Sequence, residues 1–417
     1  MHILILAHEF PPVVVGGIGT YLGQLANGLA SEGVRLSFAI GGSGLHPSII
    51  EANRQVHFYH PKVDLLTLGS ERFGLFSDLI ADEVAHRCEA EQSIPDIIHC
   101  NNWFTFRCAH RLRQRWGRPI VSTVHSLEHL FTRRWGVDTL AFIVELEREL
   151  CRSSNLVIGV SQSVAEDVRR VHAESNVIVI HNGAAPWPRV DPKAYKEVAG
   201  LCPDEVVDDG SLRKLIIFAG RLVPQKGLRF LLHAFRHICT SRDDLRLVVA
   251  GDGPEDHAEA LREFSTSDPI LASTTRLVGK LDRAQLRALY ARSAVAVVPS
   301  LYEPFGYAAI EAMAAGVPLV VSRVGGLVEI VQHGQSGVHV EIQIDSDGYA
   351  RIDADELAAA IVDLVDDPAK AQRISEAGRA RAAEFTSARM ADLTLRAYRS
   401  LLDPSYSPLS SNVARCS

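Results

Sequence analysis

The stretch "AVAVVPSLYEPFGYAAIEAMAAGVPLVVS", residues 294–322, decides the fold. It begins with a short valine-rich run, passes through the loop "EPFG" into an alanine-rich segment that ends at Gly316, and closes with the apolar run "PLVVS". Short β-branched runs bounded by turn residues are typical of buried strands, and an alanine-rich segment ended by glycine is typical of a helix. The stretch therefore predicts a strand, a helix and a second strand parallel to the first.

The same alternation runs through both halves of the chain. In the first half we expect strands at 2–7, 34–40, 96–100, 119–125, 156–161 and 176–183, and helices at 20–33, 75–91, 104–116, 140–154 and 163–173. In the second half we expect strands at 214–220, 245–251, 294–300 and 318–322, and helices at 227–238, 283–293, 306–316, 355–366, 368–384 and 387–402, with a turn and helix at 325–334. Repeated alternation of this kind predicts parallel sheets with helices on both faces.

A proline-rich and acidic segment, residues 184–213, interrupts the alternation and has the composition of a linker. We therefore expect an α/β chain with two doubly wound, Rossmann-like parallel-sheet domains facing a cleft. The expected domains are 1–185 and 213–387, joined by a linker at 186–212. Because ligands of such folds bind beyond the carboxyl ends of the strands, the loops that follow strands are where the chemistry is sought.

Composition excludes several classes of protein. A net charge of −7 over 417 residues argues against nucleic acid as the main partner. The seven cysteines are scattered without a C-x-x-C pair, which argues against a zinc site and indicates free thiols in a reducing cytosol. The N-terminus lacks the basic region and cleavage site of a signal peptide, and no apolar run approaches the ~18 residues of a membrane span. We expect a cytoplasmic protein with peripheral membrane contact at most.

Two glycine-containing loops follow predicted strands. "GGIG" at 16–19 opens the first helix, where Gly16 and Gly17 allow close approach of a ligand and the helix amides face an anion; a tight structural turn is the alternative. "FAGRLVPQKG" at 218–227 places Arg221 and Lys226 in the loop after a strand. Two cations at this spacing can clamp a diphosphate, although exposed lysine and arginine side chains are more often only solvated.

The loop "EPFG" brings a carboxylate ahead of a helix, and a second follows eight residues later. Glu303 precedes the helix and Glu311 lies about one turn inside it. The amides of Phe305, Gly306 and Tyr307 at the helix start would point at phosphate oxygens. Two acceptors around an anion site suit a nucleotide-diphosphate sugar, with a polyol on each side of the phosphates. Carboxylates that only complement the helix dipole are the alternative, which suits Glu303 alone better than the pair.

Three further strand ends in the first half carry polar residues. "STVHS" ends a strand at His125, "HCNNW" ends another at Asn102 and Trp103, and "HEFPP" places Glu9 after the first strand. His125 can contact a ligand, or be a hydrogen-bonded loop histidine. Asn102, Trp103 and Glu9 are candidates for the acceptor side of a site.

Two other patterns allow competing interpretations. The D-x-D triplets Asp345/Asp347 and Asp353/Asp355 suggest a metal, but Asp355 directly precedes a predicted helix and fits an N-cap, so we expect no metal site. The stretch 107–118 carries five arginines and no acid. It would suit an anionic membrane surface or an acidic acceptor, or be a solvated helix face.

Together these motifs resemble those of a known family. "GGIG", "FAGRLVPQKG", "VAGDGP", "VGKL" and "EPFGYAAIEAMAAGVPLVVSRVGGLVEIVQHGQSG" are similar to the motifs of the retaining glycosyltransferases of family 4, which have the GT-B architecture. The resemblance spans nearly the whole chain and is strongest in the second half, where E-x7-E and R-x4-K occur together. It departs at "HCNNW", where the commoner family sequence is "HAHDW".

The resemblance implies a nucleotide-sugar donor in the C-terminal domain and an acceptor in the N-terminal one, with the last helix, from about 388, packing back on the first domain. Glu303 would bind donor-sugar hydroxyls, Glu311 the ribose, and Arg221 with Lys226 the departing diphosphate. The same resemblance places Gly17 against the phosphates or sugar, His125 at the sugar, and Gly279 with Leu281 beside the base, and Pro304, Phe305, Gly306 and Tyr307 at the donor.

The expected activity is a retaining, metal-independent transfer of a sugar from a nucleotide-diphosphate sugar, UDP-linked in most of the family, with no other cofactor. No carboxylate nucleophile is evident, so same-face attack, in which the leaving phosphate takes the acceptor proton, is the hypothesis. The acceptor stays open between a small molecule, a glycan and a lipid, with a soluble small molecule favoured. A sugar-nucleotide 2-epimerase and a non-catalytic nucleotide-sugar binding protein are the alternatives.

Overall fold

The computed structural model consists of two compact units, one formed by Met1–Ala185 with Phe385–Ser417 and the other by Pro186–Glu384. The structure describes residues 1–11, 16–40, 56–59, 70–128, 141–187, 198, 200, 214–346, 348–403 and 405–406, with backbone only at 56–59 and 70–76. Most of the expected linker and residue Asp347 lie outside the described residues.

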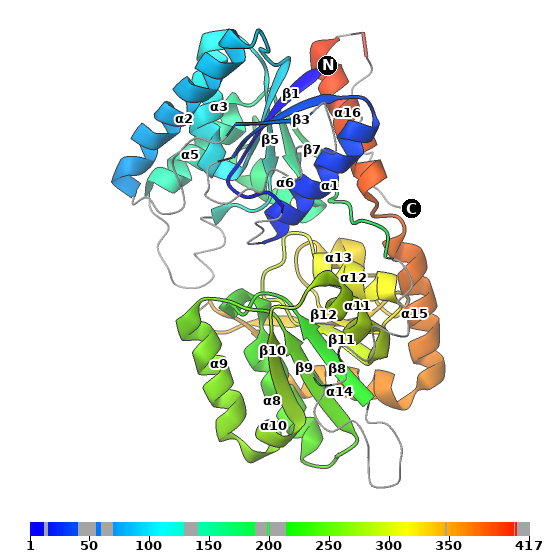
Figure 1. Ribbon diagram of the computed structural model, residues 1–417. Coiled ribbons are helices and arrows are strands. Elements are labelled where there is room, and N and C mark those ends of the chain that lie inside the picture. The colour runs from blue at the N-terminus through cyan, green and yellow to red at the C-terminus, as the bar shows by residue number, and fades with distance from the viewer. Residues whose placement is uncertain are drawn as a thin grey trace. The chain divides into compact units, whose positions relative to one another are not determined.

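The first unit is built on a parallel sheet of seven strands in the order β3-β2-β1-β4-β5-β6-β7 (Figure 1). The strands are β1 (His2–Ala7), β2 (Arg35–Ile40), β3 (Val56–Tyr59), β4 (Ile97–Asn101), β5 (Ile120–Val124), β6 (Leu156–Gly159) and β7 (Val177–Val179). Every residue of β1, β4 and β5 is buried, as expected for parallel strands covered on both faces. The order reverses at β1, so β1 and β4 flank the switch point where doubly wound folds bind ligands.

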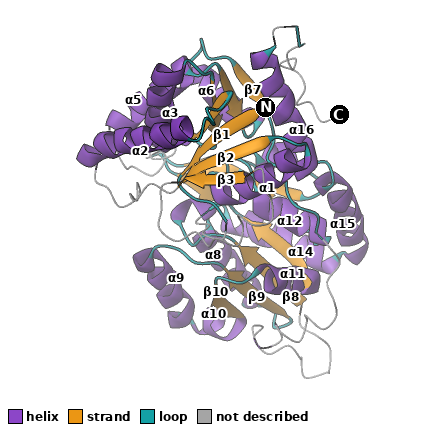
Figure 2. Cartoon of the chain, turned by 45° about the horizontal axis from the view of Figure 1, so that its top comes forward, coloured by secondary structure: helices purple, strands orange, loops and turns teal. Residues whose placement is uncertain are grey.

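Helices cover both faces of this sheet (Figures 1 and 2). They are α1 (Gly17–Ser31), α2 (Ser70–Ala90), α3 (Asn102–Trp116), α5 (Ala141–Ser153), α6 (Gln162–Val171) and α16 (Ser387–Leu402). Helix α16 packs on α1 so closely that a Cβ at Gly28 would lie 2.5 Å from the Cβ of Ala391. The last helix therefore belongs to the core of the first unit.

The second unit has a parallel sheet of six strands in the order β10-β9-β8-β11-β12-β13. The strands are β8 (Lys214–Ala219), β9 (Leu245–Ala250), β10 (Thr275–Gly279), β11 (Ser293–Val298), β12 (Leu319–Ser322) and β13 (Val338–Val340). The helices are η4 (Pro224–Lys226), α8 (Leu228–Cys239), α9 (Glu255–Ser267), α10 (Pro269–Thr274), α11 (Arg283–Arg292), α12 (Tyr307–Ala315), α13 (Leu327–Ile330), α14 (Ala354–Asp366) and α15 (Pro368–Ala382). A separate hairpin pairs β14 (Ile342–Ile344) with β15 (Ala350–Ile352).

The structure confirms the fold class: two Rossmann-like α/β units with parallel sheets. The stretch 294–322 forms β11, α12 and β12, and β11 pairs with β12 in parallel register. Several elements lay outside the sequence predictions, namely β3, β10, β13, η4, α9, α10 and the β14–β15 hairpin. The short helix α10 follows Asp268, whose carboxylate accepts from Ile270 and Leu271 amides, so capping rather than apolar periodicity defines it.

The arginines of α3 are largely neutralised within the first unit. Three of them form forked ion pairs with carboxylates of the neighbouring helix α2: Arg107 with Asp78, Arg111 with Asp82 and Arg115 with Glu89. Residues three to four apart share a helix face, which places these three arginines in one row. The three ion pairs therefore link α3 to α2. No described helix combines the length and the apolarity needed to cross a bilayer.

The D-x-D residues have structural roles. Helix α14 is capped by Asp353, whose carboxylate accepts from the amides of Asp355 and Glu356, so the expected cap at Asp355 was two residues too late. Asp355 instead pairs with His237 at 2.6 Å. Asp345 accepts from the Tyr349 amide and the Arg351 guanidinium within the hairpin. Asp345 and Asp353 therefore stabilise the local backbone, and Asp355 links α14 to α8 through His237.

Candidate active site

An ion pair joins two strand-end loops of the second unit. Lys226 Nζ donates to Glu303 Oε2 at 2.6 Å, and Ser300 Oγ donates to the same oxygen at 3.1 Å. The Glu303 side chain is only 9% exposed and that of Lys226 21%, so the pair is shielded without being sealed from solvent. Two of the residues predicted to hold a nucleotide sugar, 77 positions apart in the chain, are thus brought together.

Close backbone packing explains why the two loops meet. The Leu301 amide donates to Gln225 O at 2.7 Å, which ties the loop after β11 to η4 in the loop after β8. Gly227 has a φ of +66°, and a Cβ there would lie 1.9 Å from Pro299 O. Only glycine fits this left-handed turn without moving the neighbouring backbone.

A pair of adjacent glycines, Gly325 and Gly326, holds the backbone of Glu303. The Gly326 amide donates to Glu303 O at 2.8 Å. Gly325 has a φ of +50°, and its Cβ would lie 2.1 Å from the same carbonyl oxygen. These glycines carried no assigned role in the sequence interpretation, although the doublet in "RVGGLVEI" signalled a close backbone approach.

Helix α12 begins directly behind this loop. Gly306 is its N-cap with a φ of +124°, and Tyr307 is its first residue. Pro304 is half-buried, Phe305 is buried, and the Phe305 and Tyr307 rings meet edge to face at 5.2 Å. The first amides of a helix have no partner within it, so this helix start offers donors to an anion beside the Lys226–Glu303 pair.

The second carboxylate, Glu311, is a half-buried residue of α12. Burial raises the pKa of Glu311 to about 7, an effect that Arg283 and Arg287 of α11 partly oppose. The Arg287 guanidinium lies over the Trp187 ring at 5.2 Å. Sequence reasoning missed both arginines and Trp187, because nothing in their spacing separates them from ordinary surface residues.

The remaining predicted donor residues lie at neighbouring strand ends. Arg221 is exposed, and the described part of the chain supplies no ion-pair partner for it. Gly279 ends β10 with a φ of +72°, and its carbonyl accepts from the Gly251 amide at 2.8 Å. Leu281 is half-buried two residues later. All of them lie on the carboxyl side of the sheet, on loops that follow β8 and β10.

In the first unit, Glu9 caps helix α1. Its carboxylate accepts from the Gly16 amide at 3.0 Å and from the Gly19 amide at 2.8 Å. The Gly16 and Gly19 amides, which the sequence interpretation expected to face a bound anion, therefore donate to the Glu9 carboxylate instead. Gly16 is half-buried, with open space where its Cβ would be, and Gly17 is exposed.

His125 is held by the two asparagines of "HCNNW". Its backbone amide donates to Asn102 Oδ1 at 2.7 Å, and its ring Nε2 lies 3.2 Å from Asn101 Oδ1. Burial lowers the pKa of His125 to about 3, with smaller contributions from His8 and His99. Asn102, which has a φ of +55°, therefore holds the backbone of His125 through its side chain. Asn101, which contacts the His125 ring, was not among the residues that the sequence interpretation named.

Trp103 lies in an aromatic cluster with Phe104 and Phe142, at centroid distances of 4.5 and 6.0 Å. All three rings are half-buried. Trp103 and Phe104 lie in the first turn of α3, which directly follows β4, and Phe142 lies in the first turn of α5. The cluster is therefore near the carboxyl end of β4 in the first unit.

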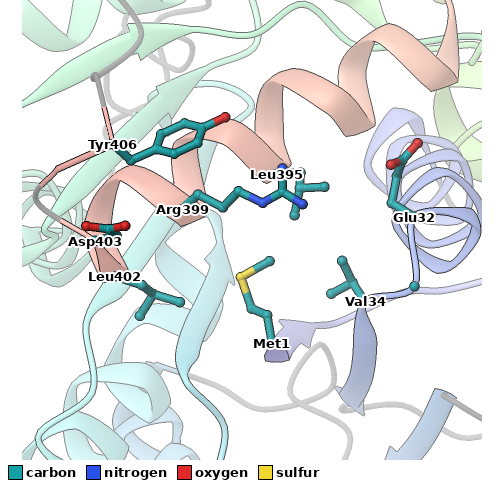
Figure 3. Close-up of a pocket in the computed structure, with 9 residues that line it drawn as sticks. Met1, Glu32, Val34, Leu395, Arg399, Leu402, Asp403 and Tyr406 are labelled. Carbon is teal, nitrogen blue, oxygen red and sulfur yellow. The ribbon is translucent and has the colours of Figure 1, made fainter.

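A cavity of about 310 Å³ opens elsewhere in the first unit. Figure 3 shows its lining, which includes Met1, Val34 and Arg399. Met1 and Val34 precede β1 and β2, so the cavity lies at the amino ends of the strands. None of the predicted site residues lines it. Among the described residues there is also no cluster of three or more potential metal ligands.

Two family models match the chain. The family model described as "Glycosyltransferase Family 4" matches residues 15–186, and that described as "Glycosyl transferases group 1" matches residues 210–381.

Two curated relatives and one solved structure cover nearly the whole chain. A glycogen synthase of Mycobacterium tuberculosis is 32% identical over 95% of this chain and 94% of its own. An alpha-maltose-1-phosphate synthase of the same species is 31% identical over 96% and 99%. The sucrose-phosphate synthase structure from Thermosynechococcus elongatus has a TM-score of 0.80 and 25% identity over 97% and 100%. With both sheets and the strand-end motifs in place, the chain belongs to the family 4 glycosyltransferases of GT-B fold and is a glycosyltransferase enzyme.

Proposed function

We propose that this enzyme transfers a sugar from a nucleotide-diphosphate sugar, UDP-linked in the first instance, to an acceptor hydroxyl with retention of the anomeric configuration and without a metal. The observation that carries the proposal is the Lys226–Glu303 contact of 2.6 Å beside the start of α12. A cation, a carboxylate and helix amides at one strand edge match the charges of a sugar diphosphate: donors for the phosphates and an acceptor for sugar hydroxyls.

The proposed chemistry follows from charge. Cleavage of the sugar–phosphate bond develops negative charge on the diphosphate and positive charge on the anomeric carbon. Lys226, Arg221 and the amides of α12 would stabilise the diphosphate, which is the electrostatic role otherwise played by a metal. Glu303 would accept hydrogen bonds from the sugar, and Glu311 would accept from the ribose. The leaving phosphate would take the acceptor proton on the same face.

The names of the relatives guide the choice of sugar and acceptor. Glycogen and α-maltose 1-phosphate, the products named for the two curated relatives, are both built of glucose. We therefore propose glucose as the transferred sugar, and a glycan or a small sugar derivative as the acceptor. His125, Asn102, Trp103 and Glu9 of the first unit remain the residues proposed for the sugar and acceptor side.

A donor panel tests this function. The purified enzyme is incubated with UDP-, ADP- and GDP-sugars, with and without EDTA, against glycogen, free glucose and glucose phosphates, and nucleotide diphosphate release is measured. We expect release from a UDP-hexose that persists in EDTA, with an α-linked product by NMR. Loss of activity in EDTA contradicts the metal-free mechanism, a β-linked product contradicts retention, and an altered sugar nucleotide without transfer indicates an epimerase.

A further inference from the structure

Asn101 contacts the ring of His125. Its side-chain amide has two different ends, and the structure fixes which end faces which neighbour. Asn101 Nδ2 lies 3.1 Å from Leu6 O, and Asn101 Oδ1 lies 3.2 Å from His125 Nε2. A backbone carbonyl only accepts, so the NH₂ group must face Leu6 and the carbonyl oxygen must face the histidine.

This orientation determines where the histidine carries its proton. Burial holds the pKa of His125 at about 3, so the ring is neutral at physiological pH and has one N–H. Because Asn101 Oδ1 can only accept, the proton resides on Nε2, and Nδ1 presents a lone pair. The described residues supply no hydrogen-bond partner for Nδ1.

The ring is also fixed in direction. The Tyr21 ring packs edge-on against it with centroids 4.7 Å apart, and Tyr21 OH is itself 3.1 Å from Thr123 Oγ1. The bond from the His125 amide to Asn102 Oδ1 holds the backbone. His125 is 7% exposed and Asn101 is fully buried, so the hydrogen bond between them is shielded from water.

We propose that Asn101 is a positioning residue that holds His125 in the Nε2–H tautomer, so that Nδ1 accepts a hydrogen bond from a hydroxyl of the bound sugar. The inference rests on the proposed function for the contact of His125 with a sugar. A hydroxyl can donate to the lone pair that this tautomer leaves on Nδ1.

The tautomer is measured directly by long-range ¹⁵N–¹H correlation NMR on the full chain labelled with [¹⁵N]histidine. The signals of His125, one of 17 histidines, are assigned by their loss in His125→Gln. We expect a protonated Nε2 and an unprotonated Nδ1 in the wild type, and a changed tautomer population in Asn101→Leu. Asn176→Leu, on an exposed asparagine before β7, is the matched control and should leave the signals unchanged. A wild-type Nδ1–H, or an unchanged tautomer in Asn101→Leu, overturns the proposal.

Asn101→Asp keeps the test valid if the leucine variant fails to fold. A carboxylate also accepts from Nε2–H, so the tautomer should persist while the added negative charge raises the pKa of His125. A switch to Nδ1–H in this variant contradicts the proposal.

Kinetics give a second readout. With a nucleotide hexose as donor, kcat/KM should fall by about 10-fold or more in Asn101→Leu and stay within about 2-fold of the wild-type value in Asn176→Leu. An unchanged kcat/KM in Asn101→Leu overturns the role of Asn101 in transfer. If the wild type consumes no nucleotide sugar, the proposed function fails, and the NMR measurement still decides the role of Asn101.

Discussion

At the scale of single residues, the candidate site contains a charge pair that is already formed. Lys226 and Glu303 neutralise each other, and Ser300 supplies a further donor to the same carboxylate oxygen. Shielding a carboxylate from water without such partners would cost free energy, so Lys226 and Glu303 stabilise each other in the absence of a ligand. A diphosphate adds negative charge on the side of Lys226, and a sugar adds hydroxyl donors on the side of Glu303.

Lys226→Ala tests the role of the cation. If Lys226 stabilises the leaving diphosphate, its loss should raise the barrier to transfer by ~2–4 kcal/mol, as the removal of an oxyanion-hole donor does. The measurement is kcat with a saturating donor. Lys214→Ala is the control, because Lys214 lies at the far end of β8, where its Nζ donates to Val365 O. Near-normal turnover in Lys226→Ala would contradict the role.

The raised pKa of Glu311 predicts how the free energy of unfolding depends on pH. Burial raises its pKa from the usual 4.5 to about 7, so between these values the folded chain holds a proton that the unfolded chain has released. The free energy of unfolding therefore falls as pH rises through this window. Glu311→Gln removes the effect and should be more stable, relative to wild type, at pH 8 than at pH 5. Calorimetric unfolding at both values, with Glu263→Gln of the exposed face of α9 as control, checks this. An equal difference at the two pH values would show that Glu311 titrates normally.

At the scale of elements, glycines rather than charged residues set the geometry of the site. The turn from η4 into α8 at Gly227 and the doublet before α13 bring three loops into backbone contact. The Lys226–Glu303 distance is a consequence of that backbone contact. The geometry of the candidate site therefore depends on these glycines as well as on the charged side chains.

Gly227→Ala should disrupt this arrangement. An alanine costs about 1–2 kcal/mol in the left-handed region, and its Cβ, 1.9 Å from Pro299 O, also forces the loops apart. We expect a loss of stability above about 2 kcal/mol together with reduced activity. Gly334→Ala is the matched control, with a φ of +74° and no neighbour within 4 Å of its Cβ, and it should cost only the conformational term. Equal losses in both variants would mean that the contact with Pro299 relaxes freely.

The elements also show how far the sequence predicts this protein. Strands and helices with strong apolar patterns, such as β1, β11 and α12, were found within a few residues of their bounds. The loop motifs "FAGRLVPQKG" and "EPFG" identified Lys226 and Glu303, which the structure brings together. Asn101 and Trp187 were missed because their importance lies in contacts across the fold, Asn101 with Leu6 and His125 and Trp187 with Arg287, that no local spacing encodes. Glu9 was found, but its carboxylate faces the amides of α1.

At the scale of the whole molecule, the chain leaves the first unit at Ala185 and re-enters it at Phe385. The two crossing points are neighbours, because the Ala184 amide donates to Phe385 O at 2.9 Å and the Ser387 amide to Ala184 O at 3.2 Å. After re-entry, α16 buries Met390, Leu395 and Tyr398 in the first unit. Tyr398 OH also lies 2.5 Å from His99 Nδ1, a fully buried ring nitrogen of β4. The first unit is thus one core made from two separate segments.

This arrangement predicts that the first unit folds without the second only if α16 is kept. Residues 1–185 joined to 385–417 by a glycine–serine linker of about six residues span the neighbouring crossing points, since each linker residue reaches ~3.3–3.6 Å. We expect this chain to be monomeric and to unfold cooperatively by calorimetry. Residues 1–185 alone would expose the apolar face of α1 and leave the buried His99 ring without Tyr398, and we expect aggregation or no transition. A cooperative transition for 1–185 alone would show that α16 contributes little to the core, and the bond from Tyr398 to His99 would then be dispensable for folding.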